Sequence, residues 1–171
     1  MNDKDVLVVD GYNIIGAWHE LERLKQVDIG QARDRLIEMM AEYQAFTGDR
    51  VIVVFDAYEV YGRESKLKKH QIEIIYTKEK ETADECIERL VKKLKHVKNQ
   101  VYVATSDYVE QRTIFSRGAL RKSARELYIE LQNMDREIAE NLENHKKLKP
   151  KSKIILDDQV MAIFEKWRRG E

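Results

Sequence analysis

The sequence VLVVDGYN at residues 6–13 decides the architecture that we expect for this chain. It opens with four apolar residues in a row, and Asp10 and Gly11 follow them directly. Short apolar runs of this kind are typical of strands that are buried on both faces, as in parallel sheets. The segment therefore predicts a strand that is buried on both faces and has an aspartate at its carboxyl end.

Three further segments predict strands. Residues 51–55 form a second apolar run, which ends in Asp56. Residues 72–76 predict a third, partly alternating strand, and residues 101–104 predict a fourth, which leads into the sequence TSD at 105–107. Three of the four predicted strands thus end in an aspartate or lead into one.

Helical periodicity occupies the intervals between the strands. Apolar residues from Ile29 to Phe46 recur three or four positions apart, and Gly48 supplies a stop. A second helix is predicted from Thr82, where Thr82 and Glu85 have the spacing of a capping box. Strands that alternate with helices predict an α/β fold with a mainly parallel central sheet and helices on both of its faces.

The C-terminal portion is predicted to be helical. An apolar stripe indicates a helix from Ser123 to about His145, and Asp157 or Asp158 can cap a last helix. Between them, residues 146–153 contain five lysines and the only proline, so we expect a joint before the C-terminal helix. A length of 171 residues, 43% of them hydrophobic, predicts one domain over residues 1–171.

The composition restricts the classes of function that we expect for the chain. Lys and Arg together number 31, and so do Asp and Glu, which argues against a protein that simply coats nucleic acid. No apolar run approaches the ~20 residues of a membrane span, so we expect no membrane partner. The N-terminus does not resemble a signal peptide, and Cys86 is the only cysteine. These two features lead us to expect a cytoplasmic protein. Basic residues are nevertheless clustered, and candidates for binding phosphates of RNA are Arg63, Lys66, Lys68, Lys69, Arg117, Arg121, Lys122, Arg125, Lys146 and Lys147.

The acids at the strand ends form the main candidate site. Ligands of open α/β sheets bind outside the carboxyl ends of the strands. If the sheet is parallel, Asp10, Asp56 and Asp107 lie at one edge, and Asp84 opens the helix after the third strand with Glu81 just before it. Converging carboxylates repel one another unless a cation neutralises them. Their hard oxygen atoms suit Mg²⁺ or Mn²⁺, which can activate a water molecule for attack on a phosphate.

Each acid also has a purely structural interpretation. Asp84 lies in the first turn of a helix, where a negative charge is favoured by the helix dipole. Asp107 can cap a helix, and Asp56 can shape a turn. Asp10 is harder to explain in this way, because it follows a buried strand directly and has Asn13 nearby. The joint pattern, rather than any single residue, indicates chemistry.

Five segments of the sequence resemble the YacP-like NYN-domain family of PIN-like nucleases. They are VDGYNIIGAW at 9–18, VIVVFDA at 51–57, TKEKETADECIE at 77–88, VATSDYVEQ at 103–111 and GALRKSAREL at 118–127, and the similarity runs on to FEKWRRG at 164–170. The chain departs from the Asn-Tyr-Asn signature of the class, since it reads Gly11-Tyr12-Asn13. Asp10 still occupies the acidic position before the signature.

The resemblance implies a three-layer PIN-like fold and an endoribonuclease that depends on Mg²⁺ or Mn²⁺ and uses no small-molecule cofactor. It implies that Asp10, Asp84 and Asp107 bind the metal and catalyse hydrolysis to a 5′-phosphate and a 3′-hydroxyl. Asn13, Asp56, Glu81, Thr105 and Ser106 are expected to support them. It also implies an mRNA substrate in the ribosomal A site, where binding to ribosomal RNA would make a strong net positive charge unnecessary.

Two other functions remain open from the residues. A PIN-like shell could bind the ribosome or RNA without cleaving it, in which case the acids would be caps. An aspartyl-phosphate protein would use Asp56, but the first strand then needs an acidic pair and supplies only Asp10. A haloacid-dehalogenase site is disfavoured similarly, because Asp10-Gly11-Tyr12 lacks the second acid two residues on.

Overall fold

The structure is a computed structural model, and it describes residues 4–57, 71–95, 99–106, 118–154 and 158–170. The side chains of residues 147–154, 158–161 and 164 are outside this description. The chain divides into two compact units, Met1–Leu131 and Gln132–Glu171, and each is described by itself.

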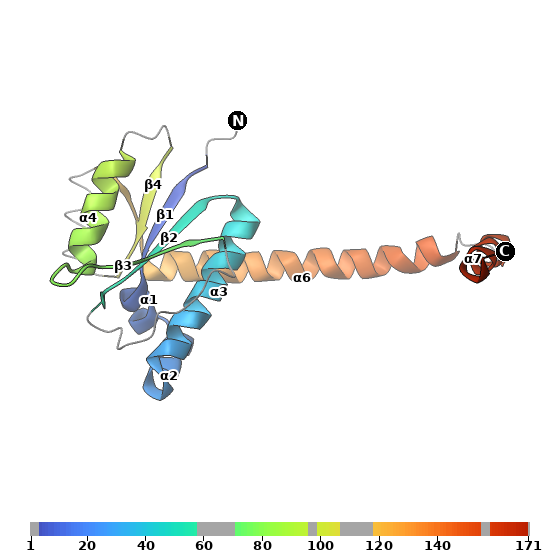
Figure 1. Cartoon of the computed structure of the whole chain (residues 1–171), viewed down its shortest axis with the longest axis horizontal. Helices are drawn as coiled ribbons and strands as arrows, with labels where there is room; N and C mark the ends of the chain where they lie inside the picture. The colour runs from blue at the N-terminus through green and yellow to red at the C-terminus, as the bar shows by residue number, and fades with distance from the viewer. Residues whose placement is uncertain (1–3, 58–70, 96–98, 107–117, 155–157, 171) are drawn as a thin grey trace. The chain divides into compact units, whose positions relative to one another are not determined.

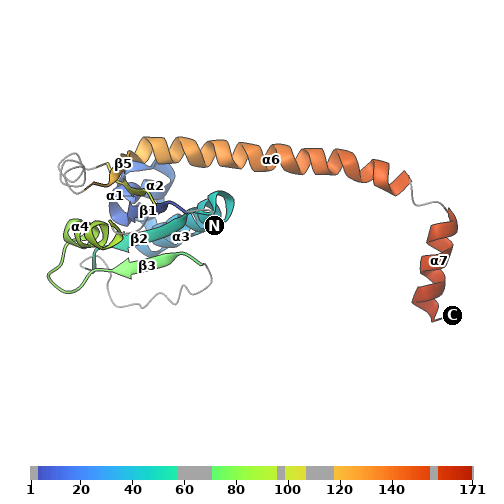
Figure 2. The ribbon, with the colours of Figure 1, turned by 90° about the horizontal axis from the view of Figure 1, so that it is seen from above.

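A parallel five-stranded sheet forms the centre of the first unit (Figure 1). Its strands are β1 (Val6–Asp10), β2 (Arg50–Phe55), β3 (Glu73–Tyr76), β4 (Val101–Ala104) and β5 (Leu120–Lys122). The order is β3-β2-β1-β4-β5, and every neighbouring pair is parallel. Figure 2 shows β3 and β5 at opposite edges of the sheet. The predicted α/β fold with a mainly parallel central sheet is confirmed.

The strand β5 was not predicted, since its three residues, LRK, form no apolar run. The strands β1, β2 and β4 match the prediction because nearly continuous burial selects runs of apolar residues, whereas β3 was predicted although it is only partly buried. All five residues of β1 are buried, whereas those of β5 are exposed or half-buried.

Six helices are described in addition to the strands: α1 (Gly11–Ala17), α2 (His19–Val27), α3 (Ile29–Thr47), α4 (Ala83–Leu94), α6 (Ala124–Ile154) and α7 (Asp158–Arg169). The predicted caps at Gly48 and Thr82 are present. Gly48 ends α3 with a φ of 76°, and the Thr82 side chain accepts a hydrogen bond of 3.2 Å from the Glu85 amide at the start of α4. The helices α1 and α2 were not predicted, and they are separated at Trp18, whose backbone is extended.

Alternating strand residues face two different layers of helix (Figure 1). On one face, Val8 and Val54 pack in a core that includes Cys86 and Val91 of α4. On the other face, α1 and α3 cover β1 and β2. Cys86 is completely buried, and this burial raises the pKa of its thiol, as expected for an inert core cysteine.

The junction of β1 and α1 has room only for glycine. A Cβ atom at Gly11 would lie 2.3 Å from Cε1 of the buried Phe55 side chain, far inside van der Waals contact. The chain can therefore pass directly from β1 into α1 beneath the Phe55 ring. This close passage fixes the position of Asp10, which precedes Gly11.

The second unit differs from expectation in one respect. Residues 146–153, where we expected a joint, belong to α6, which continues past Pro150 to Ile154. Lysine is a good helix former, and lysines flank the proline on both sides. The break before α7 therefore falls after Ile154. Among the described residues, no helix combines the length and the apolar character that crossing a membrane requires.

Candidate active site

The strand order places the candidate site at a topological switch point. From β1 the chain proceeds to β2 on one side, while β4 lies on the other side of β1. In parallel sheets the crevice at the carboxyl ends of such a strand pair is the usual ligand site. The parallel register pairs Val9 with Ala104. The residues that follow them, Asp10 and Thr105, therefore lie side by side at the carboxyl ends of β1 and β4.

Asp10 is a buried acid at this crevice. It is 7% exposed, although carboxylates are usually found at the surface. It is the N-cap residue of α1, yet its side chain makes no capping hydrogen bond. The structural interpretation of strand-end aspartates as helix caps therefore does not account for Asp10.

Asn13 connects the start of α1 to the end of β4. Its Oδ1 atom accepts hydrogen bonds from the Thr105 hydroxyl at 3.2 Å and the Ser106 hydroxyl at 2.7 Å, and also from the Ser106 amide. Thr105 is completely buried, and its amide donates to the Lys122 carbonyl at 3.2 Å, which fixes the end of β4 on its other side. The structure thus brings Asn13 together with Thr105 and Ser106, which lie 92 and 93 positions further along the chain, at the strand ends beside Asp10.

Of the other two proposed metal ligands, the structure describes only Asp84. Asp84 is exposed in the first turn of α4, and this helix begins at the same edge of the sheet as the carboxyl ends of the strands (Figure 1). Asp107 lies outside the described residues. Within the part of the chain that is described, no three His, Cys, Asp or Glu residues gather closely enough to hold a metal ion. Convergence of all three acids stays a prediction.

Two expected supporting acids follow neighbouring strands. Asp56 is half-buried after β2, and the adjacent Ala57 amide donates to the Thr77 hydroxyl at 2.9 Å. Glu81 forms an ion pair with Arg89 at 2.9 Å and accepts a hydrogen bond from the Lys78 amide at 3.3 Å. These contacts of Glu81 stabilise the turn that leads into α4.

Three residues near the site have contacts that the sequence analysis did not identify. Trp18 is 4% exposed, and its indole N–H donates to the Ala124 carbonyl at 2.8 Å. Arg33 was missed; its guanidinium donates to the Tyr12 hydroxyl at 3.1 Å, while the Tyr12 ring packs against Phe55. Thr77 was also missed. Its burial beside Ala57 has no local sequence signal, because it depends on the pairing of β2 with β3.

The basic candidates fall into three groups. Arg121, Arg125 and Lys146 are exposed and available to bind phosphate. Lys122 corrects the prediction: its ammonium donates to Glu130 at 3.0 Å and lies 4.8 Å from the centre of the Tyr102 ring, so it is engaged inside the protein. The remaining candidates lie outside the described side chains: Arg63, Lys66, Lys68, Lys69, Arg117 and Lys147.

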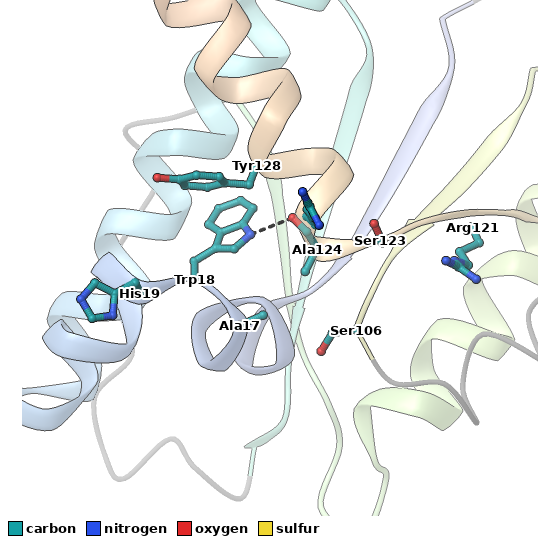
Figure 3. Close-up of a pocket in the computed structure, with 9 residues that line it drawn as sticks. Ala17, Trp18, His19, Ser106, Arg121, Ser123, Ala124 and Tyr128 are labelled. Atoms are coloured by element: carbon teal, nitrogen blue, oxygen red, sulfur yellow. Dashed lines mark hydrogen bonds between the residues drawn. The ribbon is translucent and has the colours of Figure 1, made fainter.

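A pocket of about 630 Å³ adjoins the Asp10 crevice (Figure 3). Its wall is formed by the junction of α1 and α2, by Ser106 after β4, and by the segment from Arg121 to Tyr128. Ser106 is shared between the pocket and the hydrogen bonds around Asn13. A ligand that lies in this pocket would therefore reach the crevice where Asp10 is buried.

The donor atoms around Asp10 are those that hard divalent cations prefer. Carboxylate, amide and hydroxyl oxygens gather at the crevice, and further acids are expected there from Asp84 and Asp107. The residues present therefore fit Mg²⁺ or Mn²⁺, and such a site can catalyse transfer of a phosphoryl group to water.

Comparison with known proteins gives concordant matches. Residues 7–169 match the YacP-like NYN domain family. The chain is 54% identical to the protein YacP of Bacillus subtilis (strain 168) over 167 residues, 98% of each chain. It is also similar to the crystal structure of Rae1 (YacP) from Bacillus subtilis, with a TM-score of 0.76, 54% identity and coverage of 97% of this chain and 95% of that one. A tryptophan-to-leucine mutant of Rae1 matches with a TM-score of 0.74 and 51% identity over 83% of both chains.

Proposed function

The chain belongs to the YacP-like NYN domain family, and from this membership and the geometry around Asp10 we propose that it is an endoribonuclease that requires a divalent cation. NYN domains are PIN-like nucleases, which supports a nuclease-type function on RNA. The observation that carries the proposal is a buried aspartate at the switch point of a parallel sheet, beside a hydrogen-bonded group of oxygen donors.

We assign the cation to Asp10, Asp84 and Asp107. When bound, Mg²⁺ or Mn²⁺ lowers the pKa of a water molecule and stabilises negative charge on the phosphate. Hydrolysis transfers the water oxygen to phosphorus and releases the 3′-oxygen, which leaves a 5′-phosphate and a 3′-hydroxyl. The chain needs no histidine base for this chemistry.

The remaining residues of the crevice position these groups. Asn13 accepts three hydrogen bonds from Thr105 and Ser106, so the start of α1 and the end of β4 are held in one arrangement. Because Asp10 precedes α1 directly, the same contacts restrict where its carboxylate lies. Asp56 and Glu81 act further from the phosphate, and Glu81 does so by shaping the turn before α4.

The substrate that we propose is mRNA in the ribosomal A site, within the cytoplasm. A net charge of zero is low for a protein that must find RNA unaided, but it suffices if the ribosome presents the message. Exposed basic residues such as Lys146 would contact phosphates of ribosomal RNA, which fix orientation without reading sequence. The ribosomal partner that we propose is therefore ribosomal RNA.

The test is cleavage of mRNA on translating ribosomes by Asp10→Asn, Asp84→Asn and the double variant. Asp135→Asn, at an exposed position of α6, is the matched control. We expect both single variants to lose cleavage and the control to keep it, and the fragments of the wild-type reaction to carry 5′-phosphates. Wild-type cleavage by the double variant would refute the assignment. Ribosome binding by the wild-type protein without any cleavage in Mg²⁺ or Mn²⁺ would favour a non-catalytic binding module instead.

A further inference from the structure

The pocket beside Ser106 is built from segments that tertiary contacts lock together. The indole N–H of Trp18 reaches across to the Ala124 carbonyl at 2.8 Å (Figure 3). The Ser123 hydroxyl accepts from the Glu126 amide at 3.1 Å, which caps the start of α6. The Trp18 bond thus joins walls that lie 106 positions apart, and the local cap fixes the start of α6, as expected of a preformed ligand site.

The chemistry of the wall combines cations with an aromatic surface. Arg121 and Arg125 are exposed, and none of the described residues that line the pocket is acidic. Tyr128 is 37% exposed and packs against the buried Trp18, with 5.6 Å between ring centres. Trp18 therefore supports Tyr128 from behind, while part of the Tyr128 side chain stays accessible.

This combination fits one nucleotide of a single strand. Guanidinium groups bind phosphate, and exposed aromatic rings stack on unpaired bases. A volume of about 630 Å³ lies within the usual range for small-ligand pockets, roughly 300–1,000 Å³. A base in a helix is stacked and paired, so a concave pocket admits it only after it has left the helix.

We propose that this pocket receives one nucleotide of the RNA strand that is cleaved, with its base on Tyr128 and its phosphate at Arg121 and Arg125. The inference rests on the proposed endoribonuclease function. The substrate strand is favoured over ribosomal RNA because Ser106 lines the pocket and also donates to Asn13 beside Asp10. A strand that enters the crevice therefore passes the pocket.

The test measures binding without cleavage. The full chain carrying Asp10→Asn is titrated with a fluorescein-labelled single-stranded RNA, and the dissociation constant is read from anisotropy. Adding Tyr128→Leu should weaken binding about tenfold or more, since base stacking on an aromatic ring contributes about 1–3 kcal/mol. Tyr128→Phe keeps the ring and should remain within about twofold. Arg125→Gln should weaken binding, whereas Arg136→Gln, at an exposed position further along α6, should not.

A second RNA separates stacking from misfolding. In a strand of the same length without bases, Tyr128→Leu should bind as well as the chain with Tyr128 intact, because no base is present to stack. Equal binding of the normal strand by the Tyr128→Leu and Tyr128→Phe variants would overturn the proposal. So would a Tyr128→Leu defect seen only on ribosomes, which would assign the pocket to ribosomal RNA. Because cleavage is not measured, failure here is distinct from failure of the catalytic assignment.

Discussion

Two polar clusters adjoin the same strand, β4, and serve different purposes. The Asp10 cluster consists of Asp10, Asn13, Thr105 and Ser106 at the carboxyl ends of β1 and β4. The Lys122 cluster consists of Lys122, Glu130, Tyr43 and Tyr102. Both contain side chains that are largely removed from water.

The Lys122 cluster is complete within the chain. Lys122 donates to Glu130 at 3.0 Å, and the Tyr43 hydroxyl donates to the same carboxylate at 2.9 Å. Burial and the Glu130 charge raise the pKa of Tyr43 well above its ordinary value, so the phenol stays neutral. Opposite charges therefore satisfy each other, and the cluster joins α3, β4, β5 and α6 in one unit.

The Asp10 cluster is instead rich in oxygen and would gain further negative charge from Asp84 and Asp107. The proposed function assigns to this arrangement a cation from outside the protein. The comparison teaches that burial alone does not mark a functional site. The Lys122 cluster contains its own cation, whereas the proposal adds one to the Asp10 cluster.

The largest effect that tests this difference is on cation binding. Asp10→Asn should weaken Mn²⁺ binding about 100-fold or more, because even outer-sphere partners of a metal site contribute about 10- to 100-fold. Glu130→Gln removes a carboxylate charge from the Lys122 cluster and should leave Mn²⁺ binding unchanged. Electron paramagnetic resonance of free Mn²⁺ measures both affinities. An equal loss of Mn²⁺ affinity in the two variants would mean that the two clusters do not differ in cation binding.

Asn13→Ala should lower RNA cleavage about 10- to 100-fold, because Thr105 and Ser106 lose the acceptor that holds them beside Asp10. The matched control is Gln44→Ala. Gln44 is also an amide acceptor, and it binds the Val51 amide at 3.0 Å at the other end of the sheet. The control should lose stability in a thermal melt but cleave normally. Equal cleavage by the two variants would mean that Asn13 is only structural.

Glu130→Ala should reduce the free energy of unfolding by about 1–2 kcal/mol, because it leaves the Lys122 ammonium without its carboxylate. The Lys122 side chain is only 14% exposed, whereas that of Glu130 is 42% exposed, which limits the loss. Urea unfolding measures the change, with Glu137→Ala at an exposed position of α6 as control. Cleavage by the folded variant should equal that of the wild type; a large loss of cleavage would place this cluster in the active site.

The smallest effect is a pH dependence of stability. Tyr43→Phe removes a hydrogen bond to Glu130 and should cost about 1 kcal/mol near pH 7. In the unfolded chain Tyr43 ionises near pH 10, while the folded protein keeps its pKa higher. The contribution of Tyr43 is therefore fully present below about pH 10 and declines above it. Urea titrations at pH 7 and pH 10.5 should show a smaller difference between wild type and variant at the higher pH.

The elements that the sequence predicted correctly are those that a pattern of neighbouring residues specifies. The strands β1 and β2 were predicted because each contains an apolar run that is buried on both faces, residues 6–9 in β1 and residues 51–55 in β2. The caps at Thr82 and Gly48 were predicted because they depend on neighbouring residues. The edge strand β5 and the contacts of Lys122 were not predicted. No local pattern indicates them, and Lys122 contacts Tyr43 of α3, which lies 79 positions away in the sequence.

The residues by themselves determined that Asp10 ends a buried parallel strand and that several acids and hydroxyl groups follow other strands. Only the fold decided which of them meet. The order β3-β2-β1-β4-β5 puts β4 directly beside β1, and this places Thr105 and Ser106 within reach of Asn13 while β2 carries Asp56 to the other side. The physical reason is that apolar patterning specifies which strands are buried, whereas their neighbours are fixed by how the connecting helices pack across the sheet.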